Sequence, residues 1–459
     1  MFNLLPEYCR NNAMEVPCET EVIENLKIQP NAFKVLSAAA AEGRMLIQPR
    51  CGVGMHEEML DLHRILANRS HPDMLSLTID AHTRLLRLDK VGQIMADSPA
   101  NLNGYPLINH GWQRGRELVA NAKVPIEIRH GSPDGRLLFE TAVAAGFTSY
   151  EGGGLGYNIP YCKDVKLEDS LNYWQEVDAM CGSLAKKDVI IDRELFGTMT
   201  GVLMPPSISI ACALLEGMLA AEQGVVSLSP AICQSGHPIQ DISALRSLRK
   251  LAAEYLPKEC SVFPVFHEFM GVFPRDRANA DALILLGSLV AKRGGAAKMI
   301  SKSYQEAYGV PTAYANADGI ANAAAGRSSI LDCLLPESAR IDEEIDLICR
   351  EVRAQINVVL ESDNLIKGIV KSFERGLLDV PFSASRSAKS AVVPMRDTDG
   401  FIRIHNFGGL ATNDSIKSFH KNKLDALQQD NASSYLKIQK DIFYFSSQDN
   451  EITKESNNA

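Results

Sequence analysis

Four charged residues lie at or just after the ends of short apolar segments, and together they could bind an acidic amino acid. They are Arg50, Arg84, Arg129 and Glu151. A guanidinium fork suits a carboxylate in two-point contact, and each charge-assisted bond contributes about 1.5–3 kcal/mol. Three such cations in one place would repel one another unless anions meet them, and Glu151 supplies only one charge. The missing charge predicts a ligand with two carboxylates and an ammonium group, such as glutamate or aspartate.

The arginines and the glutamate also have simpler interpretations. Arginine is common at strand ends, and local pairing with aspartates such as Asp80, Asp89 or Asp134 would explain any single one. Glu151 precedes Gly152-Gly153-Gly154, where the backbone can bend sharply and lie close to a bound molecule. A glycine-rich loop with a solvated carboxylate is the alternative to a pocket floor.

Three other polar residues are open to more than one interpretation. Lys302 and Glu306 are four residues apart, which suits an ion pair at a helix start as well as a polar clamp for ribose or adenine hydroxyls. His130 could donate a proton, donate a hydrogen bond to a carbonyl, or be structural. No phosphate-binding loop, dinucleotide fingerprint or metal-ligand spacing accompanies them, so we expect no metal site.

The elements that would position these residues alternate regularly along the chain. Short apolar or β-branched runs alternate with longer amphipathic segments, which predicts eight strands, each followed by helix, over about 280 residues. The predicted strands are Met45–Pro49, Leu75–Asp80, Pro125–Ile128, Thr148–Glu151, Val189–Glu194, Val225–Pro230, Ser261–His267 and Ala296–Lys302. This is the pattern of an α/β fold of the (β/α)8 TIM-barrel type, with a doubly wound open sheet as the alternative. In such barrels, chemistry takes place at the ends of the strands.

Outside the strand–helix repeat, the chain divides into smaller parts. We predict an N-terminal helical segment over 1–43, a barrel with its following helices over 44–383, and a small α+β C-terminal domain over 384–445. A helix pair over Ile341–Glu374 precedes the last of these, and a hairpin over Ala391–Phe407 lies within it. The polar stretch 446–459 is predicted to be disordered.

The composition is that of a soluble globular enzyme. The 459 residues carry a formal charge of −9 and 22% charged residues, with no basic run that would indicate nucleic-acid binding. Ten scattered cysteines without C-x-x-C spacing predict reduced thiols. With no apolar run long enough to span a membrane and no secretory signal pattern, we expect a cytoplasmic protein.

A series of long motifs gives the chain a specific resemblance. LIQPRCGVG, TIDAHTR, LNGYPLINHG, IRHGSPDGRLL, EGGGLGYNIPY, FGTMTGVLMPPS, VFHEFMGVFPRD and PMRDTDGFIR occur in this order. Because of these motifs, the chain resembles the large (epsilon) subunit of methylaspartate mutase, also called glutamate mutase, over about residues 20–410. The resemblance implies a (β/α)8 barrel that forms a homodimer and, with a small cobalamin-binding sigma subunit, a heterotetramer. It also implies adenosylcobalamin-dependent radical interconversion of L-glutamate and threo-3-methyl-L-aspartate, in glutamate fermentation through mesaconate.

The resemblance assigns roles to residues that match the motifs. Arg50, Arg84 and Arg129 would grip the substrate carboxylates with His130 beside them, and Glu151 would accept the ammonium and could act as a base. Tyr157 and Tyr161 would line the substrate. The positions that match contacts to the corrin or its deoxyadenosyl group are Gly52, Asn103, Pro160, Phe273, Lys302, Glu306 and Val310. Glu151, Arg84 and His130 are the predicted catalytic residues.

The chain also departs from the pattern that the resemblance leads us to expect. Cys51 stands where a small residue is expected, His82 where an aromatic is expected, and the loop 232–238, with Cys233–His237 at its centre, differs from a glycine-and-acid stretch. The cobalamin motif D-x-H-x-x-G is missing, so we expect the chain to need a partner. Two alternatives stay open: a cofactor-free lyase or aldolase barrel with Glu151 as base, and a non-catalytic protein that binds an acidic amino acid.

Overall fold

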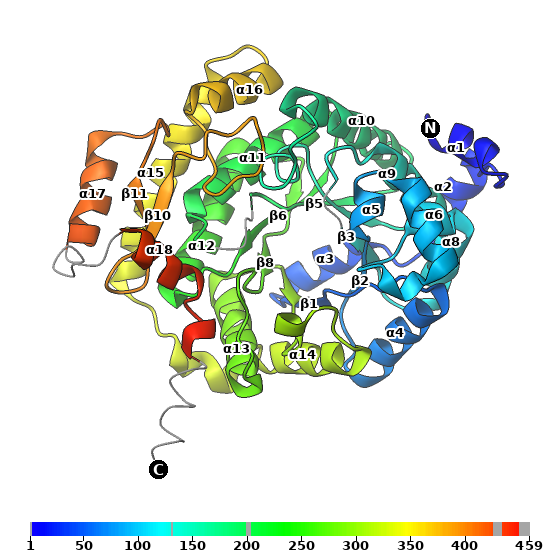
Figure 1. The fold of residues 1–459 in the computed structure, drawn as a ribbon, viewed down its shortest axis with the longest axis horizontal. Helices are drawn as coiled ribbons and strands as arrows, with labels where there is room; N and C mark the ends of the chain where they lie inside the picture. Colours follow the sequence, from blue (N-terminus) through cyan, green and yellow to red (C-terminus); the bar gives the residue numbers. More distant parts are fainter. Residues whose placement is uncertain (1, 130–131, 199–202, 426–433, 449–459) are drawn as a thin grey trace.

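The predicted strands form a ring of parallel strands at the centre of the molecule (Figure 1). The structure is a computed structural model and describes residues 2–129, 132–198, 203–425 and 434–448. The strands are β1 (Leu46–Pro49), β2 (Leu75–Thr78), β3 (Ile126–Arg129), β4 (Ser149–Glu151), β5 (Asp192–Leu195), β6 (Ser227–Cys233), β7 (Ser261–Val262), β8 (Val265–His267) and β9 (Lys298–Ser301). The TIM-barrel prediction is confirmed, and the open-sheet alternative is wrong.

The ring contains eight strand positions and is nearly closed. Its order is β1-β9-β8-β6-β5-β4-β3-β2, and β7 pairs with β6 below β8. The predicted seventh strand is therefore split at Pro264, which has no N–H to donate, although its carbonyl accepts the N–H of Ala297 at 2.8 Å. Between β1 and β2, the backbone N–H groups of Asp73 and Thr78 donate to the carbonyls of Ile47 and Cys51 at 3.0 and 2.9 Å.

Helices surround this ring on the outside (Figure 1). Before the first strand come α1 (Leu5–Asn11), α2 (Glu19–Ile28) and α3 (Ala32–Ala41). The helices between strands are α4 (His56–Arg69), α5 (Ala81–Arg84), α6 (Leu88–Asp97), α7 (Leu107–His110), α8 (Trp112–Asn121), α9 (Arg136–Ala145), α10 (Leu167–Ala185), α11 (Pro206–Glu222), α12 (Pro238–Tyr255) and α13 (Arg277–Gly294), with the 3-10 turn η1 (Pro99–Asn101). After β9 follow η2 (Glu306–Tyr308), α14 (Ala313–Ala325) and η3 (Ser329–Leu334).

Proline and glycine mark the boundaries of two barrel helices. Helix α11 has Pro206 at its first position, where the missing N–H costs nothing, and Gly224 beyond its end adopts φ +87°. Helix α12 begins at Pro238, with the ring of His237 accepting the N–H of Gln240, and ends before Pro257. These helices cover the strands with apolar side chains and leave the inside of the ring to the residues described below.

The C-terminal part lies on one side of the barrel (Figure 1). It contains α15 (Ala339–Leu360), α16 (Leu365–Arg375), the antiparallel pair β10 (Val393–Arg396) and β11 (Ile402–Asn406), α17 (Asp414–Asp425), α18 (Ser434–Ile442) and the 3-10 turn η5 (Ser446–Gln448). The predicted helix pair and hairpin are both present. The predicted tail begins within η5, and its remainder, 449–459, lies outside the described residues. Among the helices described, none combines the length and the apolar character that crossing a bilayer requires.

Candidate active site

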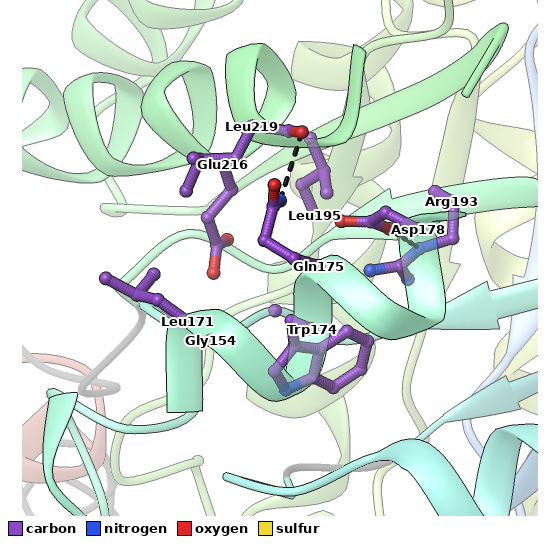
Figure 2. A pocket seen from close by; sticks show the side chains of 10 residues that line it. Gly154, Leu171, Trp174, Gln175, Asp178, Arg193, Leu195, Glu216 and Leu219 are labelled. Atoms are coloured by element: carbon purple, nitrogen blue, oxygen red, sulfur yellow. Dashed lines mark hydrogen bonds and ion pairs between the residues drawn. The ribbon is translucent and has the colours of Figure 1, made fainter. Parts of the chain in front are cut away.

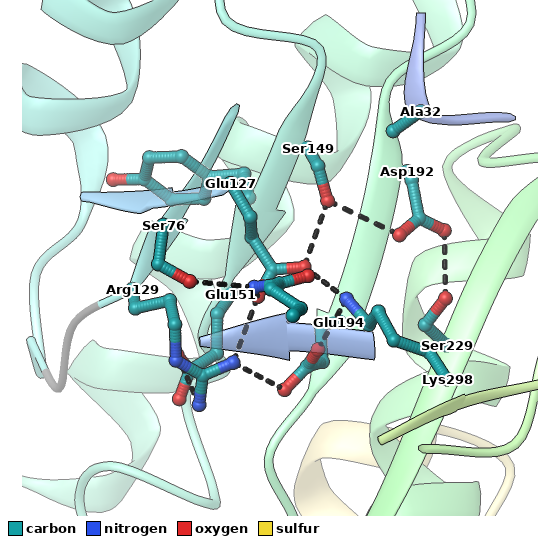
Figure 3. Close-up of polar contacts among 12 residues, drawn as sticks. Ala32, Ser76, Glu127, Arg129, Ser149, Glu151, Asp192, Glu194, Ser229 and Lys298 are labelled. Atoms are coloured by element: carbon teal, nitrogen blue, oxygen red, sulfur yellow. Dashed lines mark hydrogen bonds and ion pairs between the residues drawn. The ribbon is translucent and has the colours of Figure 1, made fainter. Parts of the chain in front are cut away.

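The inside of the barrel is lined with buried polar and charged side chains (Figure 3). Residues two apart on a strand point to the same face, and on three strands the inward pairs are polar. These pairs are Glu127 and Arg129 on β3, Ser149 and Glu151 on β4, and Asp192 and Glu194 on β5. Barrel interiors of this type are usually filled by branched apolar residues, so this interior is built for something other than packing.

Lys298 lies among the inner carboxylates and holds them together. Its Nζ is 2.7 Å from Oε2 of Glu194 and forms a short contact with Glu127. Burial disfavours the ammonium, but the two carboxylates outweigh burial and raise the pKa of Lys298. Oxygen atoms of Glu127, Glu151 and Glu194 lie within 4.8 Å of one another, and Lys298 and Arg129 meet all three.

Arg129 connects this inner network to Glu151. Its Nη1 lies 2.8 Å from Oε1 of Glu127 and 3.1 Å from Oε1 of Glu194, and its Nη2 lies 3.0 Å from Oε2 of Glu151. The side chain is buried, which by itself would lower the pKa, but the nearby carboxylates raise it above the ordinary value for arginine. Arg129 is therefore a permanent cation with three carboxylate partners inside the protein.

Glu151 is a buried acid with two partners at the end of β4. Oε1 of Glu151 accepts a short hydrogen bond from the hydroxyl of Tyr157, and Oε2 faces Arg129. Burial raises the pKa of Glu151 to about 8, and Arg129 opposes this effect without cancelling it. The alternative of a solvated carboxylate is wrong. A carboxyl group with this pKa can hold or release a proton near neutral pH.

An aromatic stack extends from Tyr157 to the inner network. The ring of Tyr157 stacks on Phe196 with centroids 4.8 Å apart, and Phe196 meets His267 edge-to-face at 5.3 Å. Nε2 of His267 lies 2.9 Å from Oε1 of Glu194, and burial lowers the pKa of His267 to about 4. The ring of Tyr161 lies 6.0 Å from that of Tyr157 but is 48% exposed. Tyr157 thus belongs to the interior and Tyr161 to the mouth.

Arg84 ends the short helix α5 after β2. Asp80 begins this helix, its Oδ1 accepting the N–H groups of His82 and Thr83 at 2.9 and 3.1 Å. Within the described part of the chain, Arg84 forms no ion pair, and its buried Nε has no hydrogen-bond partner. Burial lowers the pKa of Arg84, and its charge interacts with Tyr157, Arg50, Asp80 and Glu151. Oδ1 of Asp80 is taken up by the helix cap, and Asp80 lies beyond ion-pair distance of Arg84.

Arg50 and Lys302 share one carboxylate where β1 and β9 end side by side. Nη1 of Arg50 lies 3.3 Å from Oε1 of Glu306, and Nζ of Lys302 lies 2.9 Å from the same oxygen. The two cations lower the pKa of Glu306 against the effect of burial. Lys302 also lies 5.5 Å from the centroid of Phe273. The ion-pair interpretation of Lys302 and Glu306 therefore holds, and Arg50 joins it.

The remaining predicted cofactor positions differ in their surroundings. A Cβ on Gly52 would lie 2.5 Å from the carbonyl oxygen of Thr78, so β2 requires glycine there. Asn103 is exposed and its Oδ1 accepts the N–H of Ala81 at 2.9 Å. Pro160 is buried, whereas Val310 is 54% exposed. His130 lies outside the described residues.

The site holds more carboxylates than the single Glu151 predicted from the sequence. Glu127 and Glu194 also face Arg129, and Glu306 faces Arg50. Only Arg84, of the three arginines, has no carboxylate partner among the described residues. The available signal was the alternation of polar residues in IEIR, SYE and DREL, at positions two apart on each strand.

Two of the unexpected features, Cys51 and the 232–238 loop, lie at the ends of β1 and β6, on the same side of the barrel as the site. The Sγ of Cys51 is buried and donates to the carbonyl of Ser76 at 3.4 Å. The 232–238 loop faces the C-terminal hairpin, since Arg396 donates to the carbonyl of Ser235 and the rings of His237 and Phe401 are 3.7 Å apart. These departures therefore accompany packing contacts of the loop with the hairpin.

Comparison with known proteins identifies the family. The family model for the methylaspartate mutase E chain matches residues 28–454. The chain belongs to the methylaspartate mutase E chain family. The glutamate mutase epsilon subunit of Haloarcula marismortui is 43% identical over 87% of this chain and 83% of that protein, and that of Desulfitobacterium hafniense is 41% identical over 87% and 85%.

Membership of the methylaspartate mutase E chain family makes this chain part of an enzyme of the isomerase class. Among solved structures, the tryptophan synthase alpha subunit of Legionella pneumophila covers 64% of this chain and 97% of its own, with 12% identity and a TM-score of 0.36. That likeness is too weak to bear on function.

Proposed function

We propose that this chain is the catalytic subunit of an adenosylcobalamin-dependent mutase that interconverts L-glutamate and threo-3-methyl-L-aspartate. The observation that carries the proposal is the pairing, at one barrel mouth, of Arg84, which has no carboxylate partner among the described residues, with Glu151, a buried acid whose pKa is raised to about 8. The charge of Arg84 acts on Tyr157 and Glu151, and in this proposal all three meet one small ligand.

The substrate would complete this arrangement. Arg84 offers a fork to a carboxylate, and Arg50 could turn part of its fork from Glu306 to the other carboxylate. Glu151 would accept the ammonium, and the hydroxyl of Tyr157 would keep its carboxylate oriented. His130 and Tyr161 complete the proposed substrate set. Since Arg129 is already surrounded by Glu127, Glu151 and Glu194, its main contribution would be to orient Glu151.

The mouth has features that fit a large, flat cofactor with polar edges. Exposed apolar side chains stand on loops that follow four different strands, and such a rim favours binding of an apolar surface. They are Leu85 after β2, Tyr161 after β4, Val272 after β8, and Tyr308 and Val310 after β9. Lys302 and Glu306, with the buried Oε1 of Glu268 that has no partner among the described residues, supply polar groups beside them.

When bound, adenosylcobalamin would supply radical chemistry that no side chain of this chain can provide. Lys302 and Glu306 would hold its ribose, and Gly52, Asn103, Pro160, Phe273 and Val310 would contact its ring system or its nucleoside. The residues of the chain would bind the substrate, hold a proton at Glu151 and exclude water from the barrel mouth. A small cobalamin-binding subunit would cover the apolar rim, and two copies of each subunit would form the assembly.

Reconstitution tests this function. We would mix the chain with a cobalamin-binding sigma subunit, adenosylcobalamin and L-glutamate, and measure methylaspartate formation together with the cobalamin absorption spectrum. We expect product and a substrate-dependent spectral change, and neither with the chain alone. Glu151→Gln serves as a control that keeps the size of the side chain and removes its charge.

The outcomes separate the alternatives. Turnover of an acidic amino acid without cobalamin would select a lyase or aldolase activity instead. Glutamate binding by calorimetry without association of the small subunit would select a non-catalytic binding protein. Either result would overturn the proposed function.

A further inference from the structure

Two buried side chains, an arginine and a glutamate, hold the loop that carries Glu151 and Tyr157. The loop runs from Gly152 to Gly156, directly between these two residues. Arg193 points outward from β5 and Glu216 inward from α11, and both line a small cavity behind the loop (Figure 2). The cavity has room for about one water molecule, so it is too small for a substrate. Its importance lies in the two side chains.

Arg193 binds the backbone on both sides of Glu151. Its Nη1 donates to the carbonyl oxygen of Tyr150 at 2.8 Å, and its Nη2 donates to that of Gly152 at 3.0 Å. Its Nε donates to Oδ1 of Asp178 at 2.8 Å, which fixes the guanidinium plane. One rigid fork therefore fixes the residues before and after the proposed ammonium acceptor.

Glu216 binds the backbone just before Tyr157. Its Oε1 accepts the N–H groups of Leu155 and Gly156 at 2.7 and 2.8 Å. The contact requires glycine in the loop, because a Cβ on Gly153 would lie 2.1 Å from this oxygen. Glu216 is 4% exposed, and a buried carboxylate aimed at two backbone donors makes strong, directional bonds. The absence of a side chain at Gly153 thus lets Glu216 reach the loop from the side of α11. The glycines also leave the opposite side of the loop uncovered, at the barrel mouth.

We propose that Arg193 and Glu216 form a loop clamp that positions Glu151 and Tyr157, and that both are positioning residues for the reaction. The short hydrogen bond between Tyr157 and Glu151 spans the loop, so its length depends on where the two ends are held. Release of either end would separate the two groups, and a displacement of about 1 Å at reacting groups can cost about 100-fold in rate. The catalytic part of this inference rests on the proposed function.

Two substitutions of Glu216 distinguish the effect of side-chain length from the effect of charge. Glu216→Gln keeps an oxygen at the same reach without the charge, whereas Glu216→Asp keeps the charge and shortens the side chain by one methylene. Hydrogen exchange on the full chain would follow the amides of Leu155 and Gly156. We expect roughly tenfold faster exchange in Glu216→Asp and less than about threefold in Glu216→Gln, because only Asp fails to reach the two N–H groups.

Glu140 offers a matched control. It is equally buried, and its carboxylate accepts the N–H groups of Asn3, Leu4 and Leu5 far from the loop, at 2.7–3.2 Å. Glu140→Asp should speed exchange at residues 3–5 and leave the loop unchanged. The melting temperature of Glu140→Asp also measures how much stability is lost when a buried glutamate far from the site is shortened.

Reconstituted enzyme provides the catalytic readout. We expect kcat with L-glutamate to fall about 100-fold in Glu216→Asp, to recover to within about threefold in Glu216→Gln, and to stay unchanged in Glu140→Asp. Unchanged loop exchange in Glu216→Asp would overturn the clamp, and so would faster exchange with unchanged kcat. The hydrogen-exchange experiment does not depend on turnover. An inactive wild-type enzyme would therefore contradict the proposed function, and hydrogen exchange in the variants would still test the loop clamp.

Discussion

At the scale of single residues, the key property of the candidate site is how differently its three arginines are neutralised. Arg129 has three carboxylate neighbours, Arg50 has one, and Arg84 has none among the described residues. Arg84 is half-buried, and the charges of Asp80 and Glu151 act on it from beyond ion-pair distance. Arg84 is therefore the residue whose substitution should report most directly on the substrate.

Replacing Arg84 with lysine should weaken substrate binding severely, because a point charge cannot replace a two-point fork. We expect the apparent KM or Kd for L-glutamate to rise about 10- to 100-fold, the equivalent of one lost charge-assisted bond. Calorimetry and steady-state kinetics would measure it. Arg87→Lys, an exposed neighbour on the same loop, is the control. Unchanged affinity in Arg84→Lys would contradict a role in substrate binding.

Glu151 should make the stability of the chain depend on pH. Its pKa is raised to about 8 in the folded chain, against about 4.3 when unfolded. The folded state then binds the proton more tightly, so this contribution to the free energy of unfolding is complete below about pH 4.3 and is lost as pH rises towards 8. In Glu151→Gln, the decrease in the free energy of unfolding between pH 5.5 and 8.5 should be smaller by up to about 4 kcal/mol. Urea denaturation across this pH range would measure it. An unaltered slope in the variant would refute the raised pKa, and Glu140→Gln is the control.

At the scale of elements, a buried arginine joins the C-terminal hairpin to the helices beside the barrel. Arg403 on β11 forms ion pairs with Glu344 on α15, and its Nε lies 2.9 Å from Oδ2 of Asp397 in the turn between β10 and β11. Phe401 and Phe419 lie against its guanidinium. The hairpin is thus attached by charge as well as by apolar packing.

Arg403→Met should destabilise the protein by about 3–5 kcal/mol, because it removes the cationic partner of two buried carboxylates, Glu344 and Asp397. Thermal and urea unfolding would measure the loss. Arg350→Met removes an exposed ion pair with Asp346 on the same helix, where we expect less than about 1 kcal/mol. Similar losses in the two variants would show that Arg403 contributes packing alone.

At the scale of the whole molecule, charges inside the ring connect strands that are distant in sequence. Lys298 on β9 reaches Glu127 on β3 and Glu194 on β5. The ammonium thus cross-links strands from different sides of the barrel and neutralises acids that would otherwise repel one another.

Lys298→Met should therefore cost about 3–5 kcal/mol at pH 7.5. The loss should shrink towards pH 5, since Glu127 and Glu194, which would then share Arg129 as their remaining cation, can take up protons. Urea denaturation at the two pH values would measure it, with Lys292→Met, which removes a partly exposed pair with Asp332, as the control. A loss that does not change with pH would indicate that Lys298 acts by filling space.

The barrel and much of its order could be predicted because their causes are local. Strand positions follow from short apolar runs, and α11 and α12 each begin at a proline. The four charged residues at the strand ends could be named because parallel strands of one barrel end on the same side. The split at Pro264 also has a local cause, the one missing N–H group.

Only the tertiary structure decided which charges meet. Glu127, Glu194 and Lys298 lie on three strands separated by long stretches of sequence, and ring closure brings them within ion-pair distance. Glu216 reaches the glycine-rich loop from a helix some 60 residues away. Local sequence determines which elements form, because backbone and side-chain preferences act over a few residues. The partner of a buried charge depends on the path of the whole chain, because a charge acts through space on whatever closure places beside it.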